Sequence, residues 1–158
     1  MSKVKAVPEG FHTITPHLTV RNAAQAIEFY KKAFGAEVLN VMRDGDSIMH
    51  AALKIGDSIL MLNDEYPQMG SLSPLSTNGA GVTMHIYTDN VDTAFHRAVA
   101  AGATVSMPLM DQFWGDRYGL LTDPYGHKWS LAAHVRDMSA DEVRKAQEEA
   151  FAKMPKSA

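Results

Sequence analysis

The sequence has no cysteine among its 158 residues. This absence excludes disulfide bonds, thiolate metal ligands, iron–sulfur clusters and a cysteine nucleophile. A large excess of one charge is also missing, since the formal net charge at pH 7 is −3. A protein that binds nucleic acid through its electrostatic surface is usually strongly basic. We therefore expect no thiolate redox centre and no nucleic-acid partner.

Long hydrophobic runs are missing too. The longest apolar stretch without a charged residue, residues 98–110, is too short to span a bilayer and is interrupted by Gly102 and Pro108. The first ten residues lack the apolar segment of a secretory signal peptide. These features predict no membrane partner and a cytoplasmic location. Short motifs for phosphate binding or hydrolysis, such as G-x-G-x-x-G, G-x-S-x-G and H-E-x-x-H, are absent as well.

One order of elements occurs twice. Hydrophobic patterns predict a strand, a helix and three further strands within residues 11–63, and the same order within residues 82–135. Asn22 is the expected N-cap of the first helix, and Gly35 and Gly102 end the two helices. The predicted strands are 14–20, 37–43, 47–54 and 58–63 in the first segment, and 82–88, 103–107, 117–122 and 128–135 in the second.

The repeat is also visible in single residues. Thr15 and His17 recur at a constant interval as Thr83 and His85. We interpret the two segments as βαβββ modules, each with one sheet and one covering helix, that fold together as an α+β protein. Neither module could bury both faces of its sheet alone.

Two segments lie outside the repeat. Residues 64–81 are rich in Pro, Ser, Gly and Asn and are expected to form one long loop, either a linker or a functional lid. Residues 139–154 predict a C-terminal helix, since Ser139 and Glu142 have the spacing of a capping box. Its thin apolar stripe predicts docking on the domain or on a subunit partner, with a disordered tail as the alternative.

Several segments of the chain resemble the vicinal oxygen chelate superfamily, also called the glyoxalase/bleomycin-resistance fold, and its PhnB-like subgroup in particular. The similarity covers residues 11–137, taken as one domain. It rests on residues 15–20, 26–30, 34–37, 49–57, 60–62, 113–119 and 123–129. The resemblance implies two four-stranded sheets that curl into a cup, often completed across a homodimer. Enzymes of the superfamily hold a divalent metal there, whereas other members bind a drug without chemistry.

The resemblance also implies where metal ligands would lie. The family positions correspond to Thr15, Thr83 and Ser130, with a fourth at Leu60 or Met61. Neutral hydroxyls and a thioether are poor ligands for zinc, nickel, manganese or iron. We therefore expect no metal cofactor and no enzymatic activity of the usual kind.

Histidines offer an alternative metal site. His17 and His85 lie two residues beyond the family positions and should share their strand faces, and His134 lies four beyond Ser130. His50 could be near them. Three imidazoles could hold a divalent metal. The alternative function is therefore a metal-dependent lyase, isomerase or dioxygenase that uses these shifted histidines.

The loop before the seventh predicted strand contains Trp114, Asp116 and Arg117, which could clamp a polar ligand or form a structural salt bridge. Trp129 should lie in the core, whereas Arg97 and His127 should be exposed. Ten methionines suit either an adaptable apolar pocket or ordinary core filling.

The function predicted from these residues is binding of a small molecule by a homodimer, with sequestration of a drug or metabolite as its role. A structural or regulatory dimer with a collapsed cup is a further alternative. The expected ligand-binding residues are Thr15, His17, Thr83, His85, Ser130, Trp114 and Arg117.

Overall fold

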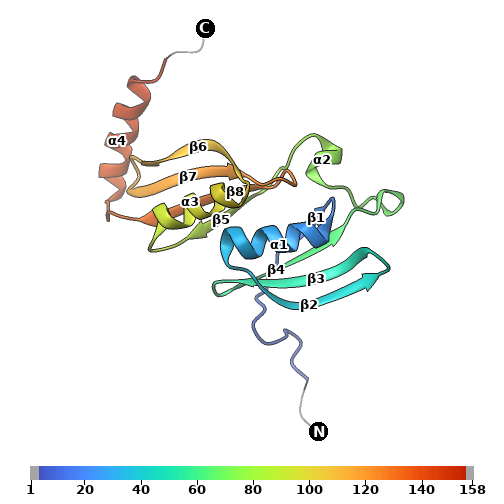
Figure 1. Ribbon diagram of the computed structural model, residues 1–158. Helices are drawn as coiled ribbons and strands as arrows, with labels where there is room; N and C mark the ends of the chain where they lie inside the picture. The colour runs from blue at the N-terminus through green and yellow to red at the C-terminus, as the bar shows by residue number, and fades with distance from the viewer. Residues whose placement is uncertain (1–3, 156–158) are drawn as a thin grey trace.

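A computed structural model describes residues 4–155, and within them the chain forms two four-stranded sheets (Figure 1). The N-terminal module comprises β1 (His17–Val20), α1 (Ala23–Phe34), β2 (Glu37–Asp44), β3 (Ser47–Ile55) and β4 (Ser58–Asp64). The C-terminal module comprises β5 (Thr83–Tyr87), α3 (Val91–Ala101), β6 (Thr104–Asp111), β7 (Asp116–Thr122) and β8 (Lys128–His134). The predicted pair of βαβββ units and the α+β class are thus confirmed.

The two sheets have the same topology. Their strand orders are β1-β4-β3-β2 and β5-β8-β7-β6, with parallel β1/β4 and β5/β8 pairs and antiparallel pairs elsewhere. Side chains alternate between the faces of each strand. On β1, Leu18 and Val20 are buried beneath the helices, whereas His17 is exposed on the other face. Each sheet therefore has one covered face and one open face.

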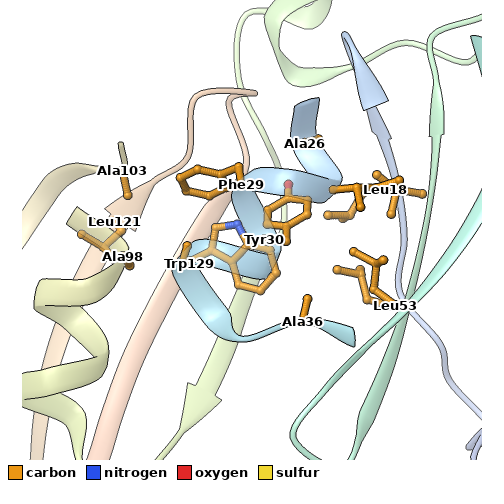
Figure 2. Close-up of a cluster of buried hydrophobic side chains, with 14 of the residues drawn as sticks. Leu18, Ala26, Phe29, Tyr30, Ala36, Leu53, Ala98, Ala103, Leu121 and Trp129 are labelled. Carbon is orange, nitrogen blue, oxygen red and sulfur yellow. The ribbon is translucent and has the colours of Figure 1, made fainter. Parts of the chain in front are cut away.

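Helices α1 and α3 pack against each other between the covered faces of the sheets (Figure 1). Figure 2 shows the apolar cluster that they enclose, in which Tyr30 of α1 lies beside Trp129 of β8. The Tyr30 hydroxyl and the Trp129 Nε1–H both donate to Asp123 Oδ2, at 2.7 and 2.8 Å. Burial, and then the Asp123 charge, raise the pKa of Tyr30 well above its usual value. This cluster joins the modules and confirms the core position of Trp129.

The start of α1 differs from the prediction. Asn22 does precede the helix, but it has a left-handed backbone (φ 62°) and its side chain caps nothing. Asp64, at the end of β4, accepts the Ala23 N–H at 2.7 Å and, through its other oxygen, the Ile48 N–H at 2.7 Å. A residue distant in sequence therefore supplies the cap. At the other end, Gly35 (φ 66°) terminates the helix as expected.

Two strands differ from the predictions by more than one residue at an end, whereas the other six agree to within one residue at each end. The first strand begins at His17 rather than at residue 14, although the Pro16 carbonyl still accepts the Met61 N–H at 2.9 Å. Strand β6 continues past residue 107 to Asp111 and contains Pro108. It lies at the edge of its sheet and has irregular register there, so the missing proline N–H is tolerated.

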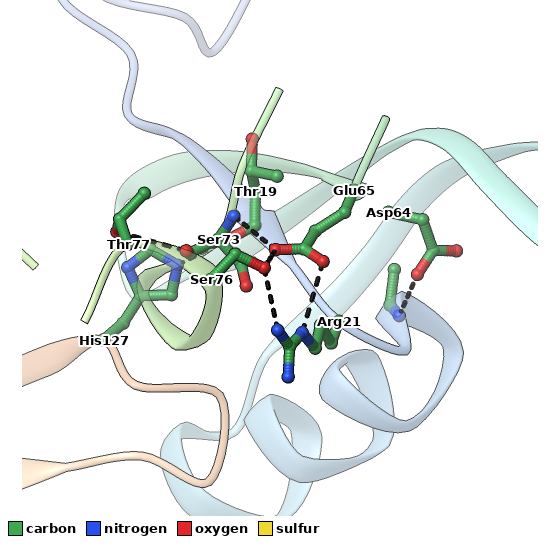
Figure 3. A network of polar contacts seen from close by, with 9 residues as sticks. Thr19, Arg21, Asp64, Glu65, Ser73, Ser76, Thr77 and His127 are labelled. Atoms are coloured by element: carbon green, nitrogen blue, oxygen red, sulfur yellow. Dashed lines mark hydrogen bonds and ion pairs between the residues drawn. The ribbon is translucent and has the colours of Figure 1, made fainter. Parts of the chain in front are cut away.

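The connection over residues 64–81 is a structured linker, not a bare loop. It contains η1 (Pro67–Met69), α2 (Pro74–Thr77) and an isolated bridge between Tyr66 and Ser71. Figure 3 shows Glu65 accepting hydrogen bonds from the Ser73 N–H (2.7 Å), the Ser76 hydroxyl and Arg21 Nε (3.2 Å). These bonds hold the pKa of Glu65 at about 2.

His127 was expected to be exposed but is partly buried. Its Nε2 lies 3.0 Å from the Thr19 carbonyl oxygen (Figure 3), which links the β7–β8 turn to β1. The turn is near this strand only because the two modules pack together. The linker and this contact thus both tie the modules to one another.

The C-terminal helix α4 (Ala140–Ala152) has the predicted capping box between Ser139 and Glu142. It projects from one end of the C-terminal sheet (Figure 1), where Phe151 contacts the ring of Phe113 edge-on with centroids 6.0 Å apart. No helix within residues 4–155 is long and apolar enough to cross a bilayer.

Candidate functional site

A cavity of about 730 Å³ lies between the two modules. The N-terminal side contributes the segment before β1, the β3–β4 turn and the end of α1. The C-terminal side contributes the edge strand β5, one face of α3 and part of β8. The lining includes Thr15, Leu60, Thr83, His85, Arg97 and Trp129. Most of the wall is apolar, with a few hydroxyl, imidazole and charged groups among the hydrocarbon.

Three predicted site residues, Thr15, Thr83 and His85, line this cavity. They reach it because Thr15 directly precedes β1, and β5 forms the edge of its sheet that faces the N-terminal module. The other four lie outside the lining: His17, Ser130, Trp114 and Arg117. The predicted set is therefore divided between the cavity and other parts of the two sheets.

His85 and Ser130 form a pair because β5 and β8 run parallel in a register that places them side by side. His85 Nδ1 lies 2.6 Å from Ser130 Oγ. Ser130 is buried, whereas His85 is exposed on the open face and against the cavity. The centroid of the Tyr87 ring lies 4.5 Å from that of the His85 ring, and the centroid of the Tyr118 ring lies 6.0 Å from it. This arrangement fixes one ring nitrogen and leaves the other for a ligand.

Asp116 organises a polar cluster at the end of the same open face. It is buried and accepts hydrogen bonds from Tyr87 Oη (3.0 Å), Trp114 Nε1 (3.1 Å) and His134 Nδ1 (2.9 Å). Desolvation opposes the charged carboxylate, but these three bonds outweigh it and lower the Asp116 pKa. The bonds to Asp116 and then Asp137 raise the pKa of His134. The indole N–H of Trp114 is therefore hydrogen-bonded within the protein.

Arg117 is engaged in ion pairs on the covered side of β7. Its Nε and Nη2 donate to the two carboxylate oxygens of Asp92, at 2.9 and 2.8 Å, and Nη1 donates to Asp111 at 3.2 Å. These carboxylates raise the pKa of Arg117. The structure thus gives Arg117 the salt bridge that was the alternative to a ligand clamp, and a role in ligand binding stays a prediction.

The shifted histidines do not meet within one chain. His17 belongs to the N-terminal sheet, whereas His85 and His134 belong to the C-terminal sheet, and both ring nitrogens of His134 are hydrogen-bonded. No group of three or more His, Asp or Glu side chains within residues 4–155 is arranged to hold a metal. Met61 lies beside His17 in the β1–β4 register, on the open face, while Leu60 points into the core.

Sequence reasoning missed the role of Arg97. It is exposed, as expected, but it also lines the cavity, and its Nε and Nη2 donate to the carbonyls of Lys32 (2.7 Å) and Lys31 (3.3 Å). It thereby binds the carboxyl end of α1, where a cation is favoured by the helix dipole. No local signal marks this role, since it depends on the packing of α3 against α1.

Comparison with known proteins agrees with the fold described above. The family model described as the Glyoxalase/Bleomycin resistance protein/Dioxygenase superfamily matches residues 10–131. An uncharacterized protein of Mycobacterium bovis, Mb0911c, is 48% identical over 137 residues, which cover 84% of this chain and 90% of that protein.

Solved structures share the fold. TioX from Micromonospora sp. ML1 is 27% identical with a TM-score of 0.62, over 78% of this chain and 99% of TioX. The PhnB protein from Bacillus cereus is 23% identical with a TM-score of 0.58, over 77% of this chain and 99% of that chain. The expected PhnB-like subgroup is thus represented among the structures that this chain resembles.

Proposed function

Because the chain belongs to the glyoxalase/bleomycin resistance protein/dioxygenase superfamily, we propose that it binds a small molecule in the cavity between its modules. The observation that carries this proposal is the cavity itself. Its volume of about 730 Å³ falls within the range of about 300–1,000 Å³ typical of ligand sites. An apolar wall with a few polar groups is the usual composition of such a site.

The lining also indicates the kind of ligand. Among the described lining residues, the permanently charged side chains are one arginine and one aspartate, Arg97 and Asp57. Trp129, Phe34 and Met84 offer aromatic and thioether contacts, while Thr83 and His85 offer hydrogen bonds. Since the charges balance, the ligand that fits best is an uncharged molecule with an aromatic or aliphatic body and one or two polar groups. Sequestration of a drug or metabolite of this kind in the cytoplasm is the role we propose.

We further propose a homodimer, in which the N-terminal open face of one subunit meets the C-terminal open face of the other. Both faces expose large apolar side chains, among them Met42, Tyr87, Met107 and Met110. Exposed apolar side chains of this size favour association. Sedimentation of the full chain tests this proposal: a species of one chain mass, 17.3 kDa, at micromolar concentration would contradict it.

Ligand binding can be followed through Trp129. The chain has two tryptophans, so Trp114→Phe leaves Trp129, which lines the cavity, as the fluorophore. Compounds from an aromatic library that bind in the cavity should change its emission and raise the melting temperature. If no compound of a diverse library does either, the binding proposal fails.

Two matched variants locate the site. Thr83 and Thr104 are both exposed threonines at the first position of an edge strand, but Thr83 lines the cavity and Thr104 does not. Thr83→Phe should weaken binding of any such compound by about tenfold, equivalent to about 1.4 kcal/mol, and Thr104→Phe should leave it unchanged. Equal effects of the two changes would place the ligand elsewhere.

The metal-dependent alternative is tested with the same protein. We propose that binding requires no divalent metal, because the family positions hold Thr15, Met61, Thr83 and Ser130. Stoichiometric zinc, nickel, manganese or iron in protein purified without chelator would favour the enzyme instead. A structural or regulatory dimer would form a dimer yet bind no library compound.

A further inference from the structure

Two histidines, His17 and His50, lie close together on the N-terminal open face. His85, His127 and His134 each have a ring nitrogen bonded to a protein group. His17 and His50 have no such partner within the described residues. Their ring centroids lie 5.7 Å apart with an interplanar angle of 88°. His17 is exposed and His50 is half-buried, so both rings are reachable from this face.

Two methionines accompany these histidines. Strand β4 lies between β1 and β3 in the sheet, and its Met61 is the register partner of His17. On β2, Met42 lies directly opposite His50. Paired residues on neighbouring strands project from the same face, so both thioethers share the face of the imidazoles. Ala52, opposite Met61 on β3, adds only a buried methyl group to this face.

Two imidazoles and two thioethers form a donor set of nitrogen and soft sulfur atoms without oxygen. Thioethers select Cu(I), whereas magnesium, calcium and manganese prefer the oxygen ligands that this set lacks. We propose that His17, His50 and Met61 bind Cu(I), with Met42 as a fourth ligand. The site draws on a single sheet of one chain. It can therefore form without the cavity ligand, although the dimer proposed above would bring the partner's C-terminal sheet over this face.

The spacing of the rings is compatible with one shared ion. A metal–nitrogen bond of about 2.0–2.1 Å places the ion about 3.2 Å from each ring centroid. Two imidazoles on one ion can thus have centroids up to about 6.4 Å apart, and the observed 5.7 Å corresponds to a bent arrangement. Because the rings are edge to face, one must rotate about its χ2 bond, which the exposure of His17 permits.

Anaerobic titration with Cu(I) against the chromophoric chelator bicinchoninate tests the proposal. We expect one Cu(I) per chain. His50→Gln should weaken binding by at least about tenfold, since even indirect changes around a metal cost 10–100-fold in affinity. His96→Gln is the matched control, because His96 is an exposed histidine on α3 with no hydrogen-bond partner among the described residues. It should leave Cu(I) affinity unchanged.

Met61→Leu tests the thioether, since it conserves size and removes the sulfur. It should weaken Cu(I) binding, and unchanged affinity would overturn the role of Met61. The whole site is overturned if the wild-type chain competes with bicinchoninate no better than the His17→Gln/His50→Gln double variant. Far-UV circular dichroism of each variant, with the melting temperature of the metal-free protein, separates a lost ligand from a lost fold.

Discussion

Asp123 is a buried carboxylate whose removal should strongly destabilise this fold. It is buried in the β7–β8 turn and accepts four hydrogen bonds. Two come from the Tyr30 hydroxyl (2.7 Å) and Trp129 Nε1 (2.8 Å), and two from the backbone N–H groups of Tyr125 (2.9 Å) and His127 (3.0 Å). The first of these bonds connects α1 of one module to the other module.

Asp123→Ala leaves the buried Tyr30 hydroxyl and Trp129 N–H without an acceptor. An unsatisfied buried polar group costs about 1–3 kcal/mol, so we expect a loss of about 4 kcal/mol in the free energy of unfolding for the two. At about 2–4 °C per kcal/mol for a chain of this size, the melting temperature should fall by about 8–16 °C. Tyr30→Phe should cost less, about 1–2 kcal/mol, because the carboxylate keeps three donors.

Urea unfolding followed by circular dichroism measures these losses. Glu149→Ala, which removes an exposed carboxylate on α4, is the control for the change in charge and should be nearly neutral. A loss below about 1 kcal/mol for Asp123→Ala, or one equal to that of the control, would refute the view that this carboxylate holds the modules together.

Two further predictions concern Glu65 and Gly119. The native pKa of Glu65 is lowered to about 2, below the ordinary value of 4.5, so its contribution to stability is present above pH 4.5 and is lost as the pH falls toward 2. Glu65→Gln should flatten the dependence of unfolding free energy on pH in this range, whereas Glu149→Gln should not. A Cβ at Gly119 would collide with the buried Phe95 ring, while one at Gly81 meets open space. Gly119→Ala should therefore destabilise by about 1–3 kcal/mol, Gly81→Ala should not, and equal melting temperatures would contradict the packing.

Much of the fold was predictable because its signals are local. Alternating residues indicated the strands, helical spacing indicated α1 and α3, and Gly35 and Gly102 ended those helices where predicted. The recurrence of one pattern indicated two modules of equal topology. Errors occurred where a distant residue intervened, as when Asp64 replaced Asn22 as the cap of α1.

The site was only partly predictable. Thr15, Thr83 and His85 all line the cavity. The sequence repeat had already indicated that Thr15 and Thr83 occupy equivalent positions in the two modules. Arg97, and the pairing of His17 with His50, had no decisive signal, because they depend on which strands are neighbours and how α3 packs on α1.

The sequence by itself determined the strand and helix positions, the duplicated modules and the family, because each depends on neighbouring residues or on a repeated pattern. Tertiary structure alone decided which side chains meet: Asp123 with Tyr30, His17 with His50, and both modules around one cavity. The physical reason is that strand register and module packing are set by the sum of many weak contacts between distant segments, and no single stretch of sequence records that sum.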